Sequence, residues 1–296
     1  MALPPDDHNH SEWSWDAIAG SMEGSCARAV ELGLPSIAFT EHFDHSRWRI
    51  SPPLADPASA EALSRVSARL ASLVAPDGCF SPTPFDSAGY LDCIERCRAT
   101  FPTLRIVSGV ELGEPHWHSE QARRLLAGGA FERVLGSLHT LKVGEDLRDV
   151  YGLFRDWPAS EGPGGVVRAY MAEILRMIES SSRFEVLAHL DYPARRWPVA
   201  EAGPCSPTDF EDEYRAVLRA LGQSGRVLEV NTRLPLDPLV VRWWHEVGGE
   251  AVSFGSDAHL PSAVAAGFVE AAAMVEAQGF RPGKAPHDFW RRALVG

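Results

Sequence analysis

Short apolar stretches alternate with longer amphipathic stretches along most of this chain of 296 residues. The apolar stretches are rich in β-branched residues and predict strands at 36–42, 104–112, 133–139, 184–191, 226–232 and 251–259. The amphipathic stretches predict helices at 14–33, 59–75, 87–100, 118–128, 165–182, 208–224, 236–248, 260–278 and 286–294. Strands that alternate with helices favour parallel pairing, and continuously apolar strands are typical of a sheet covered on both faces. The pattern therefore predicts an α/β fold.

Polar residues follow nearly every predicted strand at the point where its apolar run stops. They are Glu41 and His42, Glu111, His139, His189 and Asp191, Asn231 to Arg233, and Asp257 and His259. The carboxyl ends of all strands meet on one face of a parallel barrel, where the chemistry of such folds is placed. Residues 6–10 fit as a first strand, because His8 and His10 are two apart and point to the same side. We expect one domain over 1–296, with a helical excursion at 43–100.

A single histidine near a strand end is more often structural than a metal ligand. The histidines that lie in predicted loops or helices belong to that ordinary class, namely His45, His116, His118, His245 and His287. Six histidines and two acids at successive strand ends are a different pattern. Core packing does not explain it, because imidazole is polar at both nitrogens and a carboxylate is costly to bury unless it is paired or coordinating.

The residue types at these strand ends are typical of a metal centre. Imidazole and carboxylate ligands without thiolate suit Zn²⁺, Mn²⁺ or Fe, and this number of ligands suits two or three ions. Glu111 is the expected bridge, because a carboxylate has two oxygens and imidazole cannot bridge. Neighbouring ions stabilise the attacking and leaving oxygens of a displacement and supply hydroxide at neutral pH, which is the machinery of phosphate-ester hydrolysis.

Net charge and composition exclude some classes of partner and indicate the cellular compartment. The formal net charge is −12, which argues against a nucleic acid partner and requires a local cation for any phosphorylated substrate. The first 20 residues lack the basic and apolar regions of a signal peptide, and no apolar run is long enough to span a bilayer. Five scattered cysteines then indicate reduced thiols, so we expect a cytoplasmic protein with no membrane contact.

The ordered motifs H-N-H at 8–10, "TEH", "VEL", "GSLH", "LAHLDYP", "LEVNTR" and "FGSDAH" resemble the PHP (polymerase and histidinol phosphatase) family. The resemblance runs from residue 6 to about residue 270 and is strongest for the stand-alone histidinol-phosphatase branch. It implies a distorted (β/α)7 TIM-like barrel with a trinuclear metal site at its C-terminal face. It also implies metal-dependent hydrolysis of a phosphomonoester or phosphodiester.

The resemblance implies a set of ligands for each ion. They are His8, His10, Glu111 and Asp257 for the first, Glu111, His139 and His189 for the second, and His42 and His259 for the third. Asp16 stands where the family usually has a further histidine of the third site. Asp16 can ligate and would add negative charge there, or it can be a capping or first-turn acid of the helix that follows.

The family also places basic residues in loops that hold the substrate phosphate. Here the matching candidates are Arg195, Arg196 and Arg233, and two neighbours such as Arg195 and Arg196 cannot easily both point inward. In the expected mechanism a metal-bound hydroxide attacks phosphorus, and Asp257, His259 or a bound water protonates the leaving group. Asp191 and Glu41 are candidates for orienting ligand imidazoles, or are plain turn acids.

The expected substrate is a small phosphorylated metabolite, with histidinol phosphate first and nucleotides or other phosphate esters as alternatives. The tryptophans Trp13, Trp15, Trp48 and Trp197 could wall a pocket for a planar ring or could be ordinary packing. Rival functions are an HNH nuclease, a metal-dependent amidohydrolase, and a barrel that binds without catalysis. The acidic charge argues against the nuclease, Glu111 and the Asp257-x-His259 pair against the amidohydrolase, and the nearly complete ligand set against lost catalysis.

Overall fold

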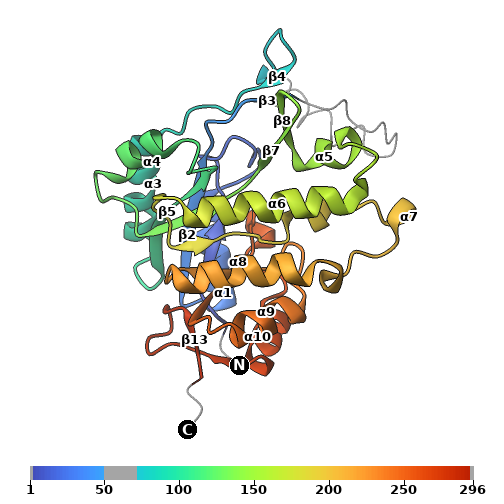
Figure 1. Ribbon diagram of the computed structural model, residues 1–296. Coiled ribbons are helices and arrows are strands. Elements are labelled where there is room, and N and C mark those ends of the chain that lie inside the picture. The colour runs from blue at the N-terminus through green and yellow to red at the C-terminus, as the bar shows by residue number, and fades with distance from the viewer. Residues whose placement is uncertain (1–2, 50–71, 294–296) are drawn as a thin grey trace.

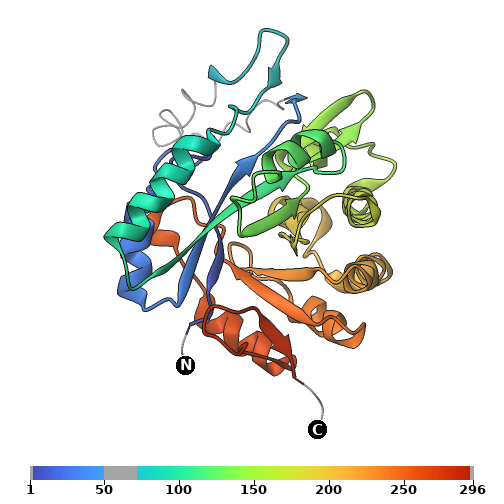
Figure 2. The ribbon, with the colours of Figure 1, turned by 90° about the vertical axis from the view of Figure 1, so that its left-hand side faces the viewer.

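The computed structural model describes residues 3–49 and 72–293. A nine-stranded sheet forms its centre and curls with the helices outside it (Figure 2). In spatial order its strands are β1 (Asp6–Asn9), β2 (Ser36–Phe43), β5 (Arg105–Gly113), β6 (Arg133–Ser137), β9 (Val186–Leu187), β10 (Val227–Asn231), β11 (Ala251–Gly255), β13 (Trp290–Arg292) and β12 (Phe280–Arg281). Every pair from β1 to β11 is parallel, which confirms the predicted α/β class.

The first and last parallel strands also meet each other. The amide of His10 donates to the carbonyl of Ala258 at 2.8 Å, and the amide of Asp257 donates to the carbonyl of His8 at 2.8 Å. These bonds form just beyond β11 and at the end of β1. The sheet is therefore curled far enough to bring its opposite edges together at their carboxyl ends.

Helices cover the outer side of the sheet (Figure 1). They are α1 (Met22–Leu32), α3 (Ser87–Thr100), α4 (Ser119–Leu126), α5 (Val150–Asp156), α6 (Gly162–Glu179), α7 (Val199–Ala202), α8 (Glu211–Gln223), α9 (Pro238–Glu246) and α10 (Phe268–Ala277). The helices α6 and α8 lie side by side and pack on the strands through apolar residues such as Ile174 and Leu218. Helix α1 begins at Met22, after its capping residue Ser21, and not at residue 14 as predicted.

The predicted helix at 286–294 is wrong. Residues 290–292 form β13, which pairs antiparallel with β11 and extends the sheet. The indole of Trp290 is buried there against Phe254, with ring centroids 5.1 Å apart. Burial of this aromatic against the edge of the sheet outweighs a weak helical pattern over a short segment.

The excursion at 43–100 is helical only in part. Its described residues contain α3 and an antiparallel pair of short strands, β3 (Trp48–Arg49) and β4 (Cys79–Phe80). The rings of Trp48 and Phe80 stack across this pair with centroids 4.7 Å apart. Most of the predicted helix at 59–75 lies outside the described residues. A hairpin formed by β7 (Thr140–Val143) and β8 (Asp146–Asp149) follows β6 and was not predicted.

All five cysteines are free thiols, as expected, and Cys93 and Cys97 are buried on α3 in the apolar cluster beside α1. Within residues 3–49 and 72–293, no helix is long and apolar enough to cross a lipid bilayer.

Candidate metal centre

The carboxyl ends of the parallel strands bring the predicted polar residues together. His8 lies on β1, His42 on β2 and Glu111 on β5, and the last two are direct register partners. His139, His189 and Asp257 each come two residues after the end of a strand. His189 and Asp257 have φ angles of 25° and 52°, which non-glycine residues seldom adopt and which turn the chain sharply at the strand ends.

Glu111 is the centre of the cluster. Its carboxylate is fully buried, and Ser137 donates a hydrogen bond to Oε1 at 2.5 Å. Five imidazoles surround it, with nitrogen–oxygen distances of 3.4 Å for His8, 3.4 Å for His10, 3.0 Å for His42, 3.3 Å for His139 and 2.8 Å for His189. Glu111, the residue expected to bridge, is thus one carboxylate in contact with five histidines.

The other two acids of the predicted set also lie in the cluster, next to its histidines. Asp257 Oδ1 is 3.5 Å from His10 Nε2 and 3.9 Å from His8 Nε2. Asp16 is 3.0 Å from His259 Nε2 through Oδ2 and 3.4 Å from His42 Nε2 through Oδ1. Asp16 therefore lies with the two histidines predicted for the third site, and it is not a helix cap, because α1 begins at Met22.

The buried polar atoms of the cluster fit divalent metal ions. There are three groups of three residues in which the possible ligand atoms lie within 4.8 Å of one another. The groups are His8, His10 and Glu111, then His42, Glu111 and His139, and then His10, His42 and His259. Glu111 Oε2, His42 Nδ1 and Asp16 Oδ1 are buried without a hydrogen-bond partner among the described residues. Such atoms are costly unless something else binds them, and nitrogen and oxygen donors without thiolate suit Zn²⁺, Mn²⁺ or Fe.

The three predicted arginines differ in their surroundings. Arg195 is mostly buried and its Nη1 lies 2.8 Å from Asp257 Oδ2, while its Nε and Nη2 are buried without a hydrogen-bond partner among the described residues. Arg233 is half exposed, with Nη1 3.4 Å from Asp257 Oδ1. Arg196 is exposed. The structure thus brings Arg195 and Arg233 to the cluster and turns Arg196 to the surface.

Two carboxylates beside the cluster were missed in the sequence. Asp44 accepts a hydrogen bond from His139 Nδ1 at 3.0 Å, and Glu229 accepts one from His8 Nδ1 at 2.5 Å. Glu229 had a signal, because it is the only acid inside the apolar strand "RVLEVNT". Asp44 had none, since it lies in a polar loop segment after the predicted strand at 36–42.

The two acids that were considered as orienting groups have different positions. Glu41 accepts hydrogen bonds from the amide and hydroxyl of Ser11 and from the hydroxyl of Ser14, which lies 3.0 Å from His10 Nδ1. Glu41 therefore acts on His10 only through Ser14. Asp191 is buried, which raises its pKa to about 6 against the effect of Arg195.

Among the tryptophans, Trp15 lies nearest to the centre. Its ring centroid is 5.6 Å from that of His42 and 5.0 Å from that of Phe80, so the β3–β4 strand pair and the cluster meet at this residue. The H-x-H pair at 116–118 lies elsewhere, with His116 bonded to Glu173 at 2.8 Å.

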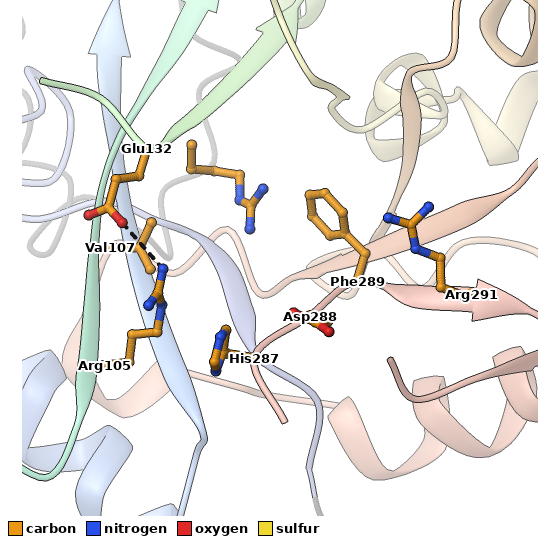
Figure 3. Close-up of a pocket in the computed structure, with 8 residues that line it drawn as sticks. Arg105, Val107, Glu132, His287, Asp288, Phe289 and Arg291 are labelled. Atoms are coloured by element: carbon orange, nitrogen blue, oxygen red, sulfur yellow. Dashed lines mark hydrogen bonds and ion pairs between the residues drawn. The ribbon is translucent and has the colours of Figure 1, made fainter. Parts of the chain in front are cut away.

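A separate cavity of about 380 Å³ lies at the opposite end of the strands (Figure 3). It is bounded by the first residues of β5, by Glu132 and Arg133 at the start of β6, and by residues 287–291. Its charged residues are largely paired, as in the Arg105–Glu132 ion pair at 3.3 Å, and Arg133 lies 4.1 Å above the Phe289 ring. The cavity contains none of the predicted ligands.

Protonation of the cluster makes the stability of the metal-free protein depend on pH. Burial opposes protonation of His8, His42 and His139, but the neighbouring carboxylates, Glu229, Asp16, Asp44 and Glu111, outweigh it and hold the three pKa values well above the usual 6.5. Above about pH 6.5 the folded state thus binds more protons than the unfolded state, so its stability falls as pH rises. The loss is about 1.4 kcal/mol per pH unit for each extra proton held.

We therefore expect the chelator-treated protein to lose stability from pH 6.5 to 9, measured by urea unfolding with tryptophan fluorescence. Zinc should reverse this trend, because the ligands must lose protons to bind it and its affinity rises with pH. A metal-free protein that gains stability over the same range would contradict the proposed charge distribution.

Comparison with known proteins shows which family the chain resembles. The PHP domain model matches residues 6–233. A protein of Clostridium acetobutylicum named "Probable histidinol-phosphatase" is 28% identical over 186 residues, which are 60% of this chain and 70% of that protein. The histidinol-phosphatase of Lactococcus lactis subsp. lactis is 24% identical over 180 residues, which are 58% of this chain and 64% of that protein.

A solved structure is similar over nearly the whole chain. The crystal structure of histidinol phosphate phosphatase from Lactococcus lactis subsp. lactis superposes with a TM-score of 0.74 and 20% identity, covering 98% of this chain and 99% of that one. That protein was crystallised with zinc, L-histidinol and phosphate. The likeness shows that the two chains share the curled, mostly parallel α/β fold.

Proposed function

The chain belongs to the PHP domain family, and from this membership we propose that it is a metal-dependent phosphoric ester hydrolase. The observation that carries the proposal is the buried Glu111 carboxylate, which contacts five imidazoles and has one oxygen without a hydrogen-bond partner among the described residues. A carboxylate placed in this way fits a bridge between divalent ions. We propose that the chain is one domain, a seven-stranded β/α barrel, and that the site lies at the carboxyl-terminal face of this barrel.

We propose two or three divalent ions, with zinc first and manganese or iron as alternatives. The first would be held by His8, His10, Glu111 and Asp257, the second by Glu111, His139 and His189, and the third by Asp16, His42 and His259. His42 Nδ1 also faces Glu111 at 3.0 Å, so His42 borders the second group as well as the third. When bound, such ions lower the pKa of a coordinated water and stabilise negative charge on phosphate oxygens.

The chain's own residues would then bind and orient the substrate. Arg195 and Arg233 approach Asp257 from two sides and would neutralise the phosphate oxygens, with Arg195 offering two donor atoms that have no other partner among the described residues. His259 or a bound water would give the proton to the leaving alkoxide. Asp257 would not, because Arg195 outweighs the effect of burial and holds the pKa of that carboxyl well below its usual range. Trp15 beside His42, with Phe80 against it, supplies an aromatic boundary for the alcohol part of the substrate.

We propose histidinol phosphate as the substrate. The names of the relatives support it, since the Clostridium and Lactococcus proteins are both named as histidinol-phosphatases and the Lactococcus structure contains L-histidinol and phosphate. An aromatic boundary formed by Trp15 and Phe80 suits a planar imidazole ring. Other small phosphate esters and nucleotides are the alternatives.

The test is a substrate and metal matrix on the full chain. We expect phosphate release from histidinol phosphate with zinc or manganese, a weaker reaction with p-nitrophenyl phosphate, and loss of both after chelation. His139→Ala should lower turnover because it removes a predicted ligand. Full phosphatase activity in the chelated protein, or unchanged turnover in His139→Ala, would overturn the metal mechanism. Cleavage of an amide and not of a phosphate ester would favour the amidohydrolase.

A further inference from the structure

Two histidines of the cluster have the same arrangement on opposite sides of Glu111. His139 turns Nε2 to Glu111 at 3.3 Å and Nδ1 to Asp44 at 3.0 Å. His8 turns Nε2 to Glu111 at 3.4 Å and Nδ1 to Glu229 at 2.5 Å. In each case one ring nitrogen faces the proposed metal centre and the other faces an outer carboxylate.

The outer carboxylates are themselves held in place. The side chain of Asp44 is 1% exposed, and its second oxygen accepts a hydrogen bond from Trp15 Nε1 at 2.8 Å. Glu229 is also 1% exposed, and its second oxygen accepts bonds from the amide of His189 at 2.6 Å and from Asn231 Nδ2 at 3.2 Å. Each carboxylate therefore has one oxygen committed to neighbouring donors and the other directed at an imidazole.

A glycine makes room for each pair. Gly113 ends β5, and a Cβ there would lie 1.9 Å from Asp44 Oδ1. Gly255 ends β11, and a Cβ there would lie 2.2 Å from Glu229 Oε1. Neither glycine has a positive φ, so the backbone conformation does not require glycine at either position. The Asp44 carboxylate occupies that space at Gly113, and the Glu229 carboxylate occupies it at Gly255 together with the Cβ of His8, which would lie 2.6 Å away.

We propose that Asp44 and Glu229 are positioning residues that hold His139 and His8 in the Nδ1–H tautomer, and that Gly113 and Gly255 lack a side chain to admit them. The inference rests on the proposed metal function. A neutral imidazole that donates from Nδ1 keeps its lone pair on Nε2, which is the atom facing Glu111 in both residues. His189 is an internal comparison, because its Nδ1 is buried without a hydrogen-bond partner among the described residues.

Asp44→Asn and Glu229→Gln test the carboxylates. The side-chain amide of Asn or Gln has one oxygen that accepts hydrogen bonds, and its other polar group is an NH₂ that donates. Asp44 accepts hydrogen bonds from two donors and Glu229 from three, on both carboxylate oxygens, so at least one of these donors must face the NH₂ group in each variant. Where that donor is the imidazole, the tautomer with Nε2–H is favoured and metal binding weakens. We expect zinc affinity to fall roughly 10- to 100-fold in each variant, measured by competition with a chromophoric chelator. Asp92→Asn, an exposed acid on α3, should leave affinity unchanged.

A double-mutant cycle tests the glycine. Gly113→Ala should weaken zinc binding in the parent chain and have little further effect in Asp44→Ala, because truncation of the Asp44 carboxylate frees the space that the new Cβ needs. Gly128→Ala is the control, since a Cβ at Gly128 meets nothing within 4 Å. Additive effects of the two substitutions would overturn the role assigned to Gly113.

Nuclear magnetic resonance of the ring nitrogens separates positioning from simple stability. In the zinc-loaded parent chain we expect protonated Nδ1 on His8 and His139, with the signal of His139 changed in Asp44→Asn and that of His8 changed in Glu229→Gln. If the parent chain binds zinc and both variants keep its affinity and tautomers, the inference is wrong although the proposed function stands. If the parent chain binds no zinc, the proposed function fails, and the inference fails with it.

Discussion

Replacing Glu111 by glutamine is expected to remove most of the bound metal and to abolish turnover. The carboxylate lies within 3.4 Å of five imidazoles, and it is the one ligand shared by the first and second of the proposed metal positions. Burial disfavours its charge, but His8, His139 and His42 outweigh burial and hold its pKa well below the usual range. Glutamine has one weak oxygen donor and no charge, so it cannot bridge cations.

We expect kcat to fall by more than the roughly 100- to 1,000-fold that follows removal of a single electrostatic contact. Elemental analysis of zinc-loaded protein and turnover of histidinol phosphate measure the two effects, and circular dichroism shows whether the variant folds. Glu31→Gln on α1, at a side chain that is 66% exposed, is the charge-matched control and should behave as the parent. A folded Glu111→Gln protein with the parent's zinc content and turnover would rule out a bridging role.

The parallel sheet was predictable because its strands are continuous apolar runs that end in polar residues. The lengths of the strands were harder to predict. A strand was expected over 184–191, and only β9, residues 186–187, forms. The chain leaves the sheet there because His189 takes a φ of 25° to reach Glu111. The contact of His189 with Glu111 therefore outweighs the local strand propensity of residues 188–191.

The start of the first helix shows the same competition. Residues 14–21 continue a helical pattern, yet α1 begins at Met22. The hydroxyl of Ser14 is bonded to Glu41 and the carboxylate of Asp16 to His259, and both contacts hold this segment in a loop over the cluster. Long-range contacts of this kind leave no periodic signal in a sequence.

Most residues of the cluster could be predicted, whereas the residues behind it could not. Strand ends are visible as breaks in hydrophobicity, which places His42 and Glu111 on one face without any coordinates. The position of Asp44 beside the cluster can be recognised only once β2 and β5 are paired, because Gly113 at the end of β5 then leaves space for its carboxylate. A lone buried charge such as Glu229 is the one signal of this type that a sequence carries, because an unpaired carboxylate would be too costly inside a strand.

Replacing Arg195 by alanine is expected to have the second largest effect on turnover. Its guanidinium lies against Asp257 at 2.8 Å and over the Tyr192 ring at 4.9 Å, which fixes its direction, and two of its nitrogens have no hydrogen-bond partner among the described residues. Burial raises the pKa of Asp257, but Arg195, followed by His8 and His259, outweighs burial and keeps it well below the usual range. Removing Arg195 therefore removes a hydrogen-bond donor for the substrate phosphate and also makes the Asp257 carboxyl harder to ionise.

We expect kcat/KM for histidinol phosphate to fall roughly 100-fold or more in Arg195→Ala, with weaker inhibition by inorganic phosphate. Arg195→Lys should recover part of the loss, because it restores the charge without the two-pronged donor. Arg196→Ala is the neighbouring control and should stay close to the parent, since Arg196 is exposed. If Arg196→Ala costs more than Arg195→Ala, the phosphate lies on the outer side of this turn and the assignment of Arg195 is wrong.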